Sequence, residues 1–197
     1  MNNNSTTNNI PRLPPGQHKT KKFPVLQKGR IAHINREAYK LQIEGEIEYP
    51  RTFSLDELNK LKDKEILTDI HCVTTWSKFD TRWGGLSFIK LLDLVKPRTT
   101  ANFVEFYCAD KGFTTTVPIE RIQVDNALLA LTYEGIPIDD KHGGPVRVVI
   151  PDLYFYKSAK WLAKITFLEK DRLGYWERRG YSNKADPWKE QRYRSND

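Results

Sequence analysis

Residues Ile70–Asp80 read IHCVTTWSKFD and are the most informative stretch of this chain. A strand-like run leads into Cys72, which stands between a histidine and a Thr-Thr-Trp turn. A lone thiol at the edge of a core is positioned to act as a soft metal ligand or as a nucleophile. The alternative is a buried, inert cysteine, and by default most single cysteines are of that kind.

The residue before this cysteine bears on the nucleophile hypothesis. Successive side chains on a strand point to opposite faces, so His71 is expected to face away from Cys72. A thiol enzyme that uses Cys72 with His71 is one hypothesis for the chain. The two residues make a poor nucleophile–base pair, because such a pair must lie within hydrogen-bond reach.

Two further motifs follow Cys72 in order, HGGPVRVVIP over 142–151 and KSAKWL over 157–162. With Cys72, they resemble the sulfite-oxidase-type domain that binds a molybdenum cofactor, and in particular its short members, the sulfite-oxidase-like oxidoreductases. The ordered motifs together are more specific than any one of them. The resemblance runs from about Phe23 to Tyr193 and includes the flanking sequences FPVL at 23–26, WERRGY at 176–181 and DPW at 186–188.

The resemblance implies a molybdenum held by the dithiolene of molybdopterin and by one protein thiolate. Cys72 matches that ligand, so it is the implied metal-binding and catalytic residue. A coordinating thiol is held deprotonated by the charge of the metal. The phosphate of the pterin needs cations or free N–H groups. The residues at positions that contact the cofactor in the family are His142, Arg147, Phe155, Tyr156, Lys157, Ser158 and Lys160.

Each of these residues also has a simpler explanation. Arg147 could be a surface charge between strands, and Lys160 could lay its stem beside Trp161. The order H-x-x-x-x-R followed by K-S-x-K-W favours the ligand interpretation for the set. Cys108 matches a position near the metal in related enzymes, although a buried strand cysteine needs no function.

The implied chemistry is oxygen-atom transfer on a small-molecule substrate, with a two-electron change at molybdenum. True sulfite oxidases follow the ligand cysteine with Gly-Asn-Arg-Arg, whereas this chain has VTTWSK at 73–78. The substrate classes that the resemblance leaves open are a small oxyanion, such as sulfite, and a sulfoxide. The sequence contains no haem or iron–sulfur motif, so we expect a separate redox partner protein.

The composition is typical of a soluble globular protein, with 39% hydrophobic and 29% charged residues. No apolar run approaches the roughly 20 residues that a membrane helix needs. The amino-terminal residues are polar and lack the apolar core of a secretory signal, so we expect a cytoplasmic protein. Cys72 and Cys108 are too few for a disulfide framework or a structural zinc site.

Positive charge is concentrated at the amino terminus. Residues 1–36 carry seven Lys and Arg and no acid, so they account for the whole formal charge of +7. We expect 1–22 to be a disordered basic arm, and 23–197 to be the molybdopterin-binding oxidoreductase domain with an irregular carboxy-terminal tail. The competing function is a non-catalytic basic module that binds nucleic acid. The chain has no recognised nucleic-acid motif, so such a partner is not expected.

Hydrophobic periodicity predicts strands mixed with short helices and no regular βαβ repeat, hence an α+β fold with a single mixed sheet. A capping box at Ser54–Glu57 predicts a helix to about Lys62, and Ser87 begins a second helix that Pro97 ends. Gly84-Gly85 is expected to break the chain between them. The predicted strands are 39–44, 66–73, 103–108, 113–117, 146–150 and 161–168, whereas 127–133 is ambiguous.

Overall fold

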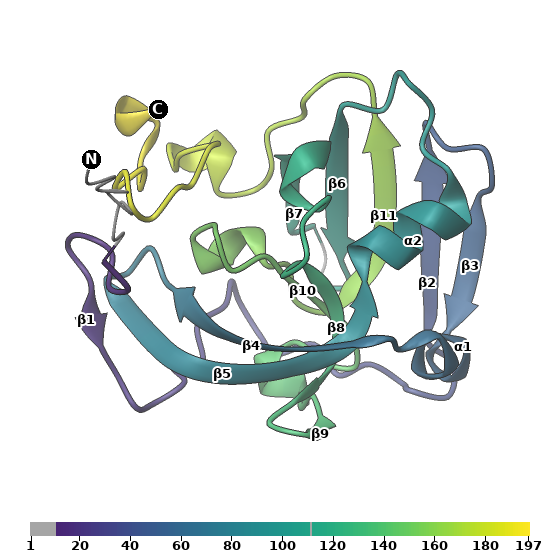
Figure 1. Ribbon diagram of the computed structural model, residues 1–197, viewed down its shortest axis with the longest axis horizontal. Helices are drawn as coiled ribbons and strands as arrows, with labels where there is room; N and C mark the ends of the chain where they lie inside the picture. The colour runs from purple at the N-terminus through teal and green to yellow at the C-terminus, as the bar shows by residue number, and fades with distance from the viewer. Residues whose placement is uncertain (1–10, 111) are drawn as a thin grey trace, which may run out of the picture.

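The computed structural model describes residues 11–110 and 112–197. Its main elements are two mixed β-sheets and two short α-helices (Figure 1). The first sheet has the strand order β1-β5-β8-β10, and β4 and β9 pair with β5 and β8. Its strands are β1 (His18–Lys19), β4 (Lys64–His71), β5 (Trp76–Ser87), β8 (Leu128–Tyr133), β9 (Ile136–Pro137) and β10 (Arg147–Val149). The second sheet has the order β3-β2-β11-β6-β7. Its strands are β2 (Lys40–Gly45), β3 (Arg51–Ser54), β6 (Phe103–Cys108), β7 (Thr114–Pro118) and β11 (Leu162–Leu168).

The α+β prediction is confirmed, although the strands form two mixed sheets where the sequence predicted one. The parallel pairs are β1 with β5 and β11 with β2, and the remaining ladders are antiparallel. Strand β2 has the predicted alternation, because Leu41 and Ile43 are buried while Lys40, Gln42 and Glu44 are exposed. Sequentially distant strands therefore meet at the centre of the second sheet, where β11 lies between β2 and β6.

The main core lies where the two sheets and helix α2 (Phe88–Val95) meet. Leu41, Phe88 and Phe106 are completely buried there, together with Val148 and Ile165. Each such side chain contributes about 1.5–3 kcal/mol of hydrophobic stabilisation relative to full exposure. This packing makes a rigid frame from which the loops at the strand ends project.

Both predicted helices are present, and each begins at the capping residue that the sequence indicates. Helix α1 (Leu55–Leu61) begins with the capping box, in which the Ser54 side chain accepts from the Glu57 N–H and the Glu57 carboxylate accepts from the Ser54 N–H. Ser87 caps α2 through its side chain alone, which accepts from the Lys90 N–H, and Lys96 ends the helix in a left-handed conformation before Pro97. Neither helix of the described residues is long and apolar enough to cross a membrane.

The expected break at Gly84-Gly85 is wrong, because β5 runs through both glycines for twelve residues. At Gly85 an added Cβ would lie 2.0 Å from the Leu129 carbonyl oxygen, so the neighbouring strand β8 approaches more closely than a side chain allows. The register between β5 and β8 also shifts between these two glycines. The pair therefore marks a bulge inside a strand rather than its end. The ambiguous segment 127–133 is the strand that packs against it.

The predicted amino-terminal arm is only partly described, since residues 1–10 lie outside the described residues. Residues 11–22 lie against the first sheet, where His18–Lys19 pair in parallel with Trp76–Ser77. Arg12 forms ion pairs with Asp69 and Asp80, which fixes this part of the chain to β4 and β5.

Residues 169–197 form a carboxy-terminal tail of loops and short 3-10 turns, and a buried ion pair attaches this tail to the domain. Lys157 donates to Glu177 Oε1 at 2.6 Å, and both side chains are at most 1% exposed. The same ammonium donates to the Thr116 carbonyl oxygen at 2.9 Å and to Asn183 Oδ1 at 3.1 Å. Thr115 donates a further hydrogen bond to the Glu177 carboxylate. One ion pair thus joins the tail to strand β7 and to the 3-10 helix η3 (Phe155–Lys157).

We expect Lys157→Met to lower the free energy of unfolding by about 3–5 kcal/mol, because it leaves the Glu177 carboxylate buried without its cation. The double variant K157M/E177Q should recover part of that loss, because the amide carries no charge. Lys164→Met is the matched control, since it breaks an exposed pair with Glu44 and should cost at most about 1 kcal/mol. Urea unfolding measures all three. Equal losses for K157M and K164M would contradict the assignment.

Candidate functional site

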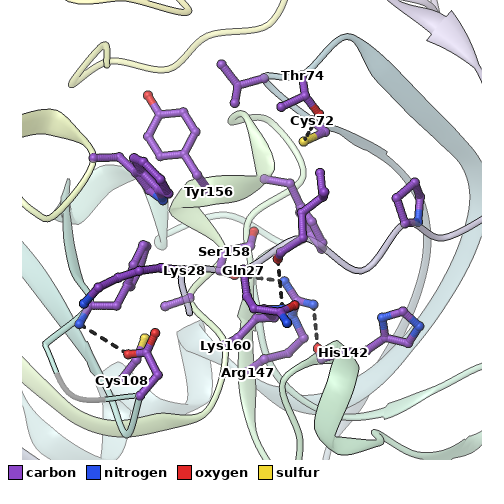
Figure 2. A pocket seen from close by; sticks show the side chains of 18 of the residues that line it. Gln27, Lys28, Cys72, Thr74, Cys108, His142, Arg147, Tyr156, Ser158 and Lys160 are labelled. Atoms are coloured by element: carbon purple, nitrogen blue, oxygen red, sulfur yellow. Dashed lines mark hydrogen bonds between the residues drawn. The ribbon is translucent and has the colours of Figure 1, made fainter. Parts of the chain in front are cut away.

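A cavity of about 270 Å³ opens where loops from both sheets meet (Figure 2). Its volume is close to the lower end of small-molecule pockets, roughly 300–1,000 Å³. Trp76 and Arg147 of the first sheet and Cys108 of the second sheet contribute to the lining. The structure brings together all but one of the residues predicted from the sequence: Cys72, His142, Arg147, Phe155, Tyr156, Ser158 and Lys160 line this cavity.

Cys72 is held by a tight turn at the end of β4. Its N–H donates to the Trp76 carbonyl oxygen at 2.8 Å, and its sulfur lies 3.1 Å from Thr74 Oγ1. Burial raises the pKa of the thiol, and the hydrogen bond from Thr74 only partly offsets this. Cys72 is therefore a protonated, unreactive thiol at neutral pH in the absence of a metal, whose charge would displace the proton.

The thiol-enzyme hypothesis fails at His71. Its side chain lies on the other face of the strand, with Nδ1 2.8 Å from Ser77 Oγ and its ring edge-on to Trp188. Burial lowers the pKa of His71 to about 4, so the ring is neutral at pH 7. A raised thiol pKa and a histidine that faces away leave Cys72 without a general base.

Arg147 is a buried cation without an anionic partner. Its guanidinium donates to the carbonyl oxygens of His142 at 2.7 Å and Ser158 at 2.9 Å, and it lies 4.3 Å from the centre of the Phe155 ring. Within the described residues no carboxylate lies within ion-pair distance of it. Burial lowers the pKa of Arg147 to about 9, which still leaves it charged at neutral pH. Burying an unpaired charge is costly, so this arrangement indicates an anionic ligand.

Lys160 supplies a second such cation. It donates to the carbonyl oxygens of Leu26 at 3.0 Å and Lys141 at 3.2 Å, and it forms no ion pair within the part of the chain that the structure describes. Burial, followed by repulsion from Arg147, lowers the pKa of Lys160 to about 8. Gly143 has a φ of +98°, and a Cβ there would meet Lys160 Cβ at 2.6 Å, so glycine is required for the lysine to pack at this point.

The other predicted residues shape the walls of the cavity. The His142 ring stacks on Phe23 with centroids 4.0 Å apart, and burial lowers its pKa. Ser158 Oγ accepts from the Ile150 N–H at 3.0 Å, and the Tyr156 hydroxyl donates to the Ser182 carbonyl oxygen. The hydroxyl hydrogen of Ser158 remains available for a ligand.

Lys157 is the predicted cofactor contact that the structure places elsewhere. It follows Phe155 and Tyr156 directly, but its ammonium points into the buried pair with Glu177 and does not line the cavity. In a 3-10 helix successive side chains diverge around the axis, so neighbours in sequence need not face one ligand. The role of Lys157 is to anchor the tail.

Sequence reasoning missed residues from the segment 23–28 and from the start of β5. The structure adds Gln27 and Trp76, which carry buried polar atoms (Oε1 and Nε1) with no hydrogen-bond partner in the described residues. Buried polar atoms in proteins are nearly always paired. An acceptor and a donor left open in one cavity fit an organic ligand that supplies the missing partners. Gln27 lies in a segment without regular structure, whereas Trp76 begins β5 within the stretch that contains Cys72, and in neither case does the sequence reveal that a polar atom is left without a partner.

The segment that contributes Gln27 is loosely attached. Within the described residues no backbone N–H between 23 and 35 donates a hydrogen bond. The segment is held instead by contacts that involve side chains: the Phe23 ring, the hydrogen bond from Lys160 to the Leu26 carbonyl oxygen, Lys28 over the Tyr175 ring, and His33 Nδ1 at 2.7 Å from the Asp140 carboxylate. One wall of the cavity is therefore built from chain that belongs to neither sheet.

Positive charge is not spread evenly over the cavity. Arg147 and Lys160 both act on the Cys108 thiol, whose pKa is raised mainly by burial, whereas the cation that acts on Cys72 is Arg192, which does not line the cavity. Figure 2 shows the Cys72 sulfur on one side of the cavity and Arg147 with Lys160 across from it. The cavity therefore has a Cys72 end and a cationic end.

Comparison with known proteins assigns this architecture. The model of the oxidoreductase molybdopterin-binding domain matches residues 28–176. The chain belongs to this family. It is 37% identical to the uncharacterized oxidoreductase YuiH of Bacillus subtilis, over 92% of each chain.

Two further relatives extend beyond this chain. The catalytic subunit of the protein-methionine-sulfoxide reductase MsrP of Campylobacter jejuni is 31% identical over 74% of this chain, which spans 54% of that protein. The crystal structure of the sulfane dehydrogenase SoxCD of Paracoccus pantotrophus shares the fold with a TM-score of 0.65 and 18% identity. That match covers 71% of this chain and 40% of the SoxCD chain.

The cofactor of this molybdopterin-binding oxidoreductase is molybdenum with molybdopterin, and the residues present fit it. The Cys72 sulfur is a donor that molybdenum accepts, and Arg147 with Lys160 can hold the phosphate. Gln27 and Trp76 offer an open acceptor and donor to the ring system.

Anion binding at the cationic end should weaken as pH rises. A ligand anion favours protonated Lys160, so affinity falls once pH exceeds the pKa of about 8. At pH 9 only about a tenth of Lys160 is protonated, and Arg147 is near its own pKa of about 9, so sulfate, which stays dianionic, should bind the cofactor-free protein at least about tenfold more weakly than at pH 7. Sulfate-dependent shifts of Tm against sodium chloride at equal ionic strength measure this.

The control for this titration is Lys160→Met. Its sulfate affinity should be low at both pH values and should change much less between them. A wild-type affinity that does not fall between pH 7 and pH 9 would contradict the assignment of Lys160 to the anion site.

Proposed function

We propose that this chain is a molybdenum-cofactor-dependent oxidoreductase that catalyses oxygen-atom transfer on a small molecule. One observation carries the proposal: a fixed thiol and two cations without counter-ions line the same cavity. The family and the relatives agree with it. When bound, the molybdenum cofactor supplies the two-electron change and the exchangeable oxygen.

The residues of the chain then have distinct roles. Cys72 ligates the metal, and its turn fixes the direction of the sulfur. Arg147 and Lys160 bind the phosphate, while Ser158 donates to it or to the tail of the pterin. The rings of Phe155 and Trp76 cover the cavity on the first-sheet side and exclude water, which strengthens every polar contact inside.

The substrate that we propose is a sulfoxide, with a small sulfur oxyanion as the alternative. Next to Cys72 the cavity is lined by Val73, Thr74 and Trp76, which carry no charge. The cation that acts on the Cys72 thiol, Arg192, does not line the cavity, and its guanidinium donates to the Val73 carbonyl oxygen at 2.7 Å. A sulfite dianion would need cationic donors at the reacting end, whereas a neutral S=O group needs a single neutral donor. The name of the MsrP relative, a protein-methionine-sulfoxide reductase, supports the same class.

A separate protein exchanges the electrons in this proposal, because the sequence carries no second redox centre. The MsrP relative is named as a catalytic subunit, which implies that it works with another chain. The two cysteines are free thiols, as is usual in reducing compartments, and we propose the cytoplasm as the location.

Replacing the ligand sulfur tests the function directly. In a host that makes the cofactor, Cys72→Ser should lower the molybdenum content per chain by at least about tenfold, because a neutral hydroxyl replaces the thiolate. Elemental analysis and fluorescence of the released pterin measure metal and cofactor separately. Cys108→Ser is the matched control and should retain molybdenum. Folded wild-type protein with neither molybdenum nor pterin would overturn the proposal.

A further inference from the structure

A ladder of aromatic rings leads from the surface into the cavity. Tyr175 stands edge-on to Trp176 at 5.0 Å, and Trp176 lies 5.1 Å from Tyr181. Tyr181 is in turn 5.6 Å from Tyr193, which is 53% exposed. Trp176 and Tyr181 line the cavity, whereas Tyr175 and Tyr193 do not. The ladder therefore connects the outside of the tail to the cavity wall.

Cations surround the outer end of this ladder. Lys28 lies 4.3 Å from the centre of the Tyr175 ring, and Arg179 lies 3.6 Å from it. Arg178 and Arg194 complete the group, since Arg178 donates to the Leu173 carbonyl oxygen and Arg194 to that of Glu177. We call Lys28, Tyr175, Arg178, Arg179, Tyr193 and Arg194 the basic rim.

The charge of the basic rim is not neutralised by the protein. Within the described residues none of its four cations forms an ion pair. Of the acids near them, Glu177 belongs to the buried pair with Lys157, and Asp110 acts on Lys28 electrostatically without forming an ion pair within the described residues. Exposed arginines beside tyrosines are the residue types enriched where proteins meet.

We propose that the basic rim is the docking surface for a small one-electron carrier protein with an acidic face. The proposal rests on the proposed function, in which electrons must reach or leave the cavity. Each encounter moves one electron between the carrier and the bound cofactor, so two encounters balance each oxygen atom transferred. Reduction of a sulfoxide also takes up two protons and releases water, and it leaves two carriers oxidised.

The position of the rim favours a redox carrier over a nucleic acid. The aromatic ladder leads from the rim to the cavity, and its two inner rings, Trp176 and Tyr181, line the cavity, where the bases of a nucleic acid could not stack on them. A carrier docked at Tyr175 would be separated from the cavity by packed rings rather than by water. Electron-transfer complexes are small and short-lived, and charge complementarity sets their rate of association.

The test uses holoenzyme that has been reduced with dithionite and then reoxidised by ferricyanide, an anion, or by hexaammineruthenium(III), a cation. The rate with ferricyanide should exceed what its driving force alone gives, and it should fall steeply with added salt. The variant R178E/R179E should slow ferricyanide by about ten- to a hundredfold and should speed hexaammineruthenium. Stopped-flow absorbance, normalised to molybdenum content, measures both.

The matched control is K40E/K60E, which makes the same change of charge at β2 and helix α1. Figure 1 shows α1 at the far end of the molecule from the carboxy-terminal tail. This variant should leave both rates within about twofold of wild type, since solvent ions screen charges at the other end of the molecule from the rim. Equal effects of the two variants, or a ferricyanide rate independent of salt, would overturn the docking surface and leave the proposed function standing.

Two other outcomes are informative. A preparation without molybdenum would overturn the proposed function and this inference with it. Salt-sensitive binding of a fluorescent single-stranded oligonucleotide that R178E/R179E abolishes, with unchanged ferricyanide rates, would assign the rim to nucleic acid instead.

Discussion

The unpaired charge of Arg147 is the constraint on which the cavity depends. Carbonyl oxygens on both sides of β10 hold the guanidinium, those of His142 before it and Ser158 after it. These contacts position the loops on either side of β10, and Gly143 then lets Lys160 pack beside them. Two desolvated cations lower the free energy of unfolding of the cofactor-free protein, and a bound anion restores it by pairing with them. Binding of the anionic ligand therefore supplies part of the stability of the folded protein.

The architecture separates the frame from the chemistry. The two sheets and α2 bury the apolar residues, while every side chain at the cavity projects from a strand end, a short 3-10 turn or a loop. Cys72 illustrates the principle, because the turn between β4 and β5 fixes its sulfur more firmly than a free loop would. The buried pair of Lys157 and Glu177 extends this order to the tail, together with backbone hydrogen bonds from Tyr154 to Ala185 and from Tyr175 to Thr114.

The sequence predicted those features of the fold that depend on residues close together in the chain. The capping box of α1, the alternation of β2 and the strands at 103–108 and 113–117 each depend on neighbouring residues, and all are confirmed. The glycine pair in β5 misled because its reason is the close approach of β8, which the chain order does not reveal. Lys157 misled for the opposite reason, since it stands among cavity residues in sequence but turns toward Glu177 in space. Gln27 and Trp76 could not be predicted, because an unsatisfied atom exists only in a folded structure.

The segment of residues 23–35 determines how the cavity can open. Because none of its backbone N–H groups donates a hydrogen bond within the described chain, the segment is held by contacts that involve side chains, among them the Phe23 ring, the pair of His33 with Asp140 and the hydrogen bond from Lys160 to the Leu26 carbonyl oxygen. Breaking these contacts leaves the strand pairing of both sheets intact, so opening of this wall costs less free energy than global unfolding. A ligand therefore has a route into the cavity that does not pass through the unfolded state.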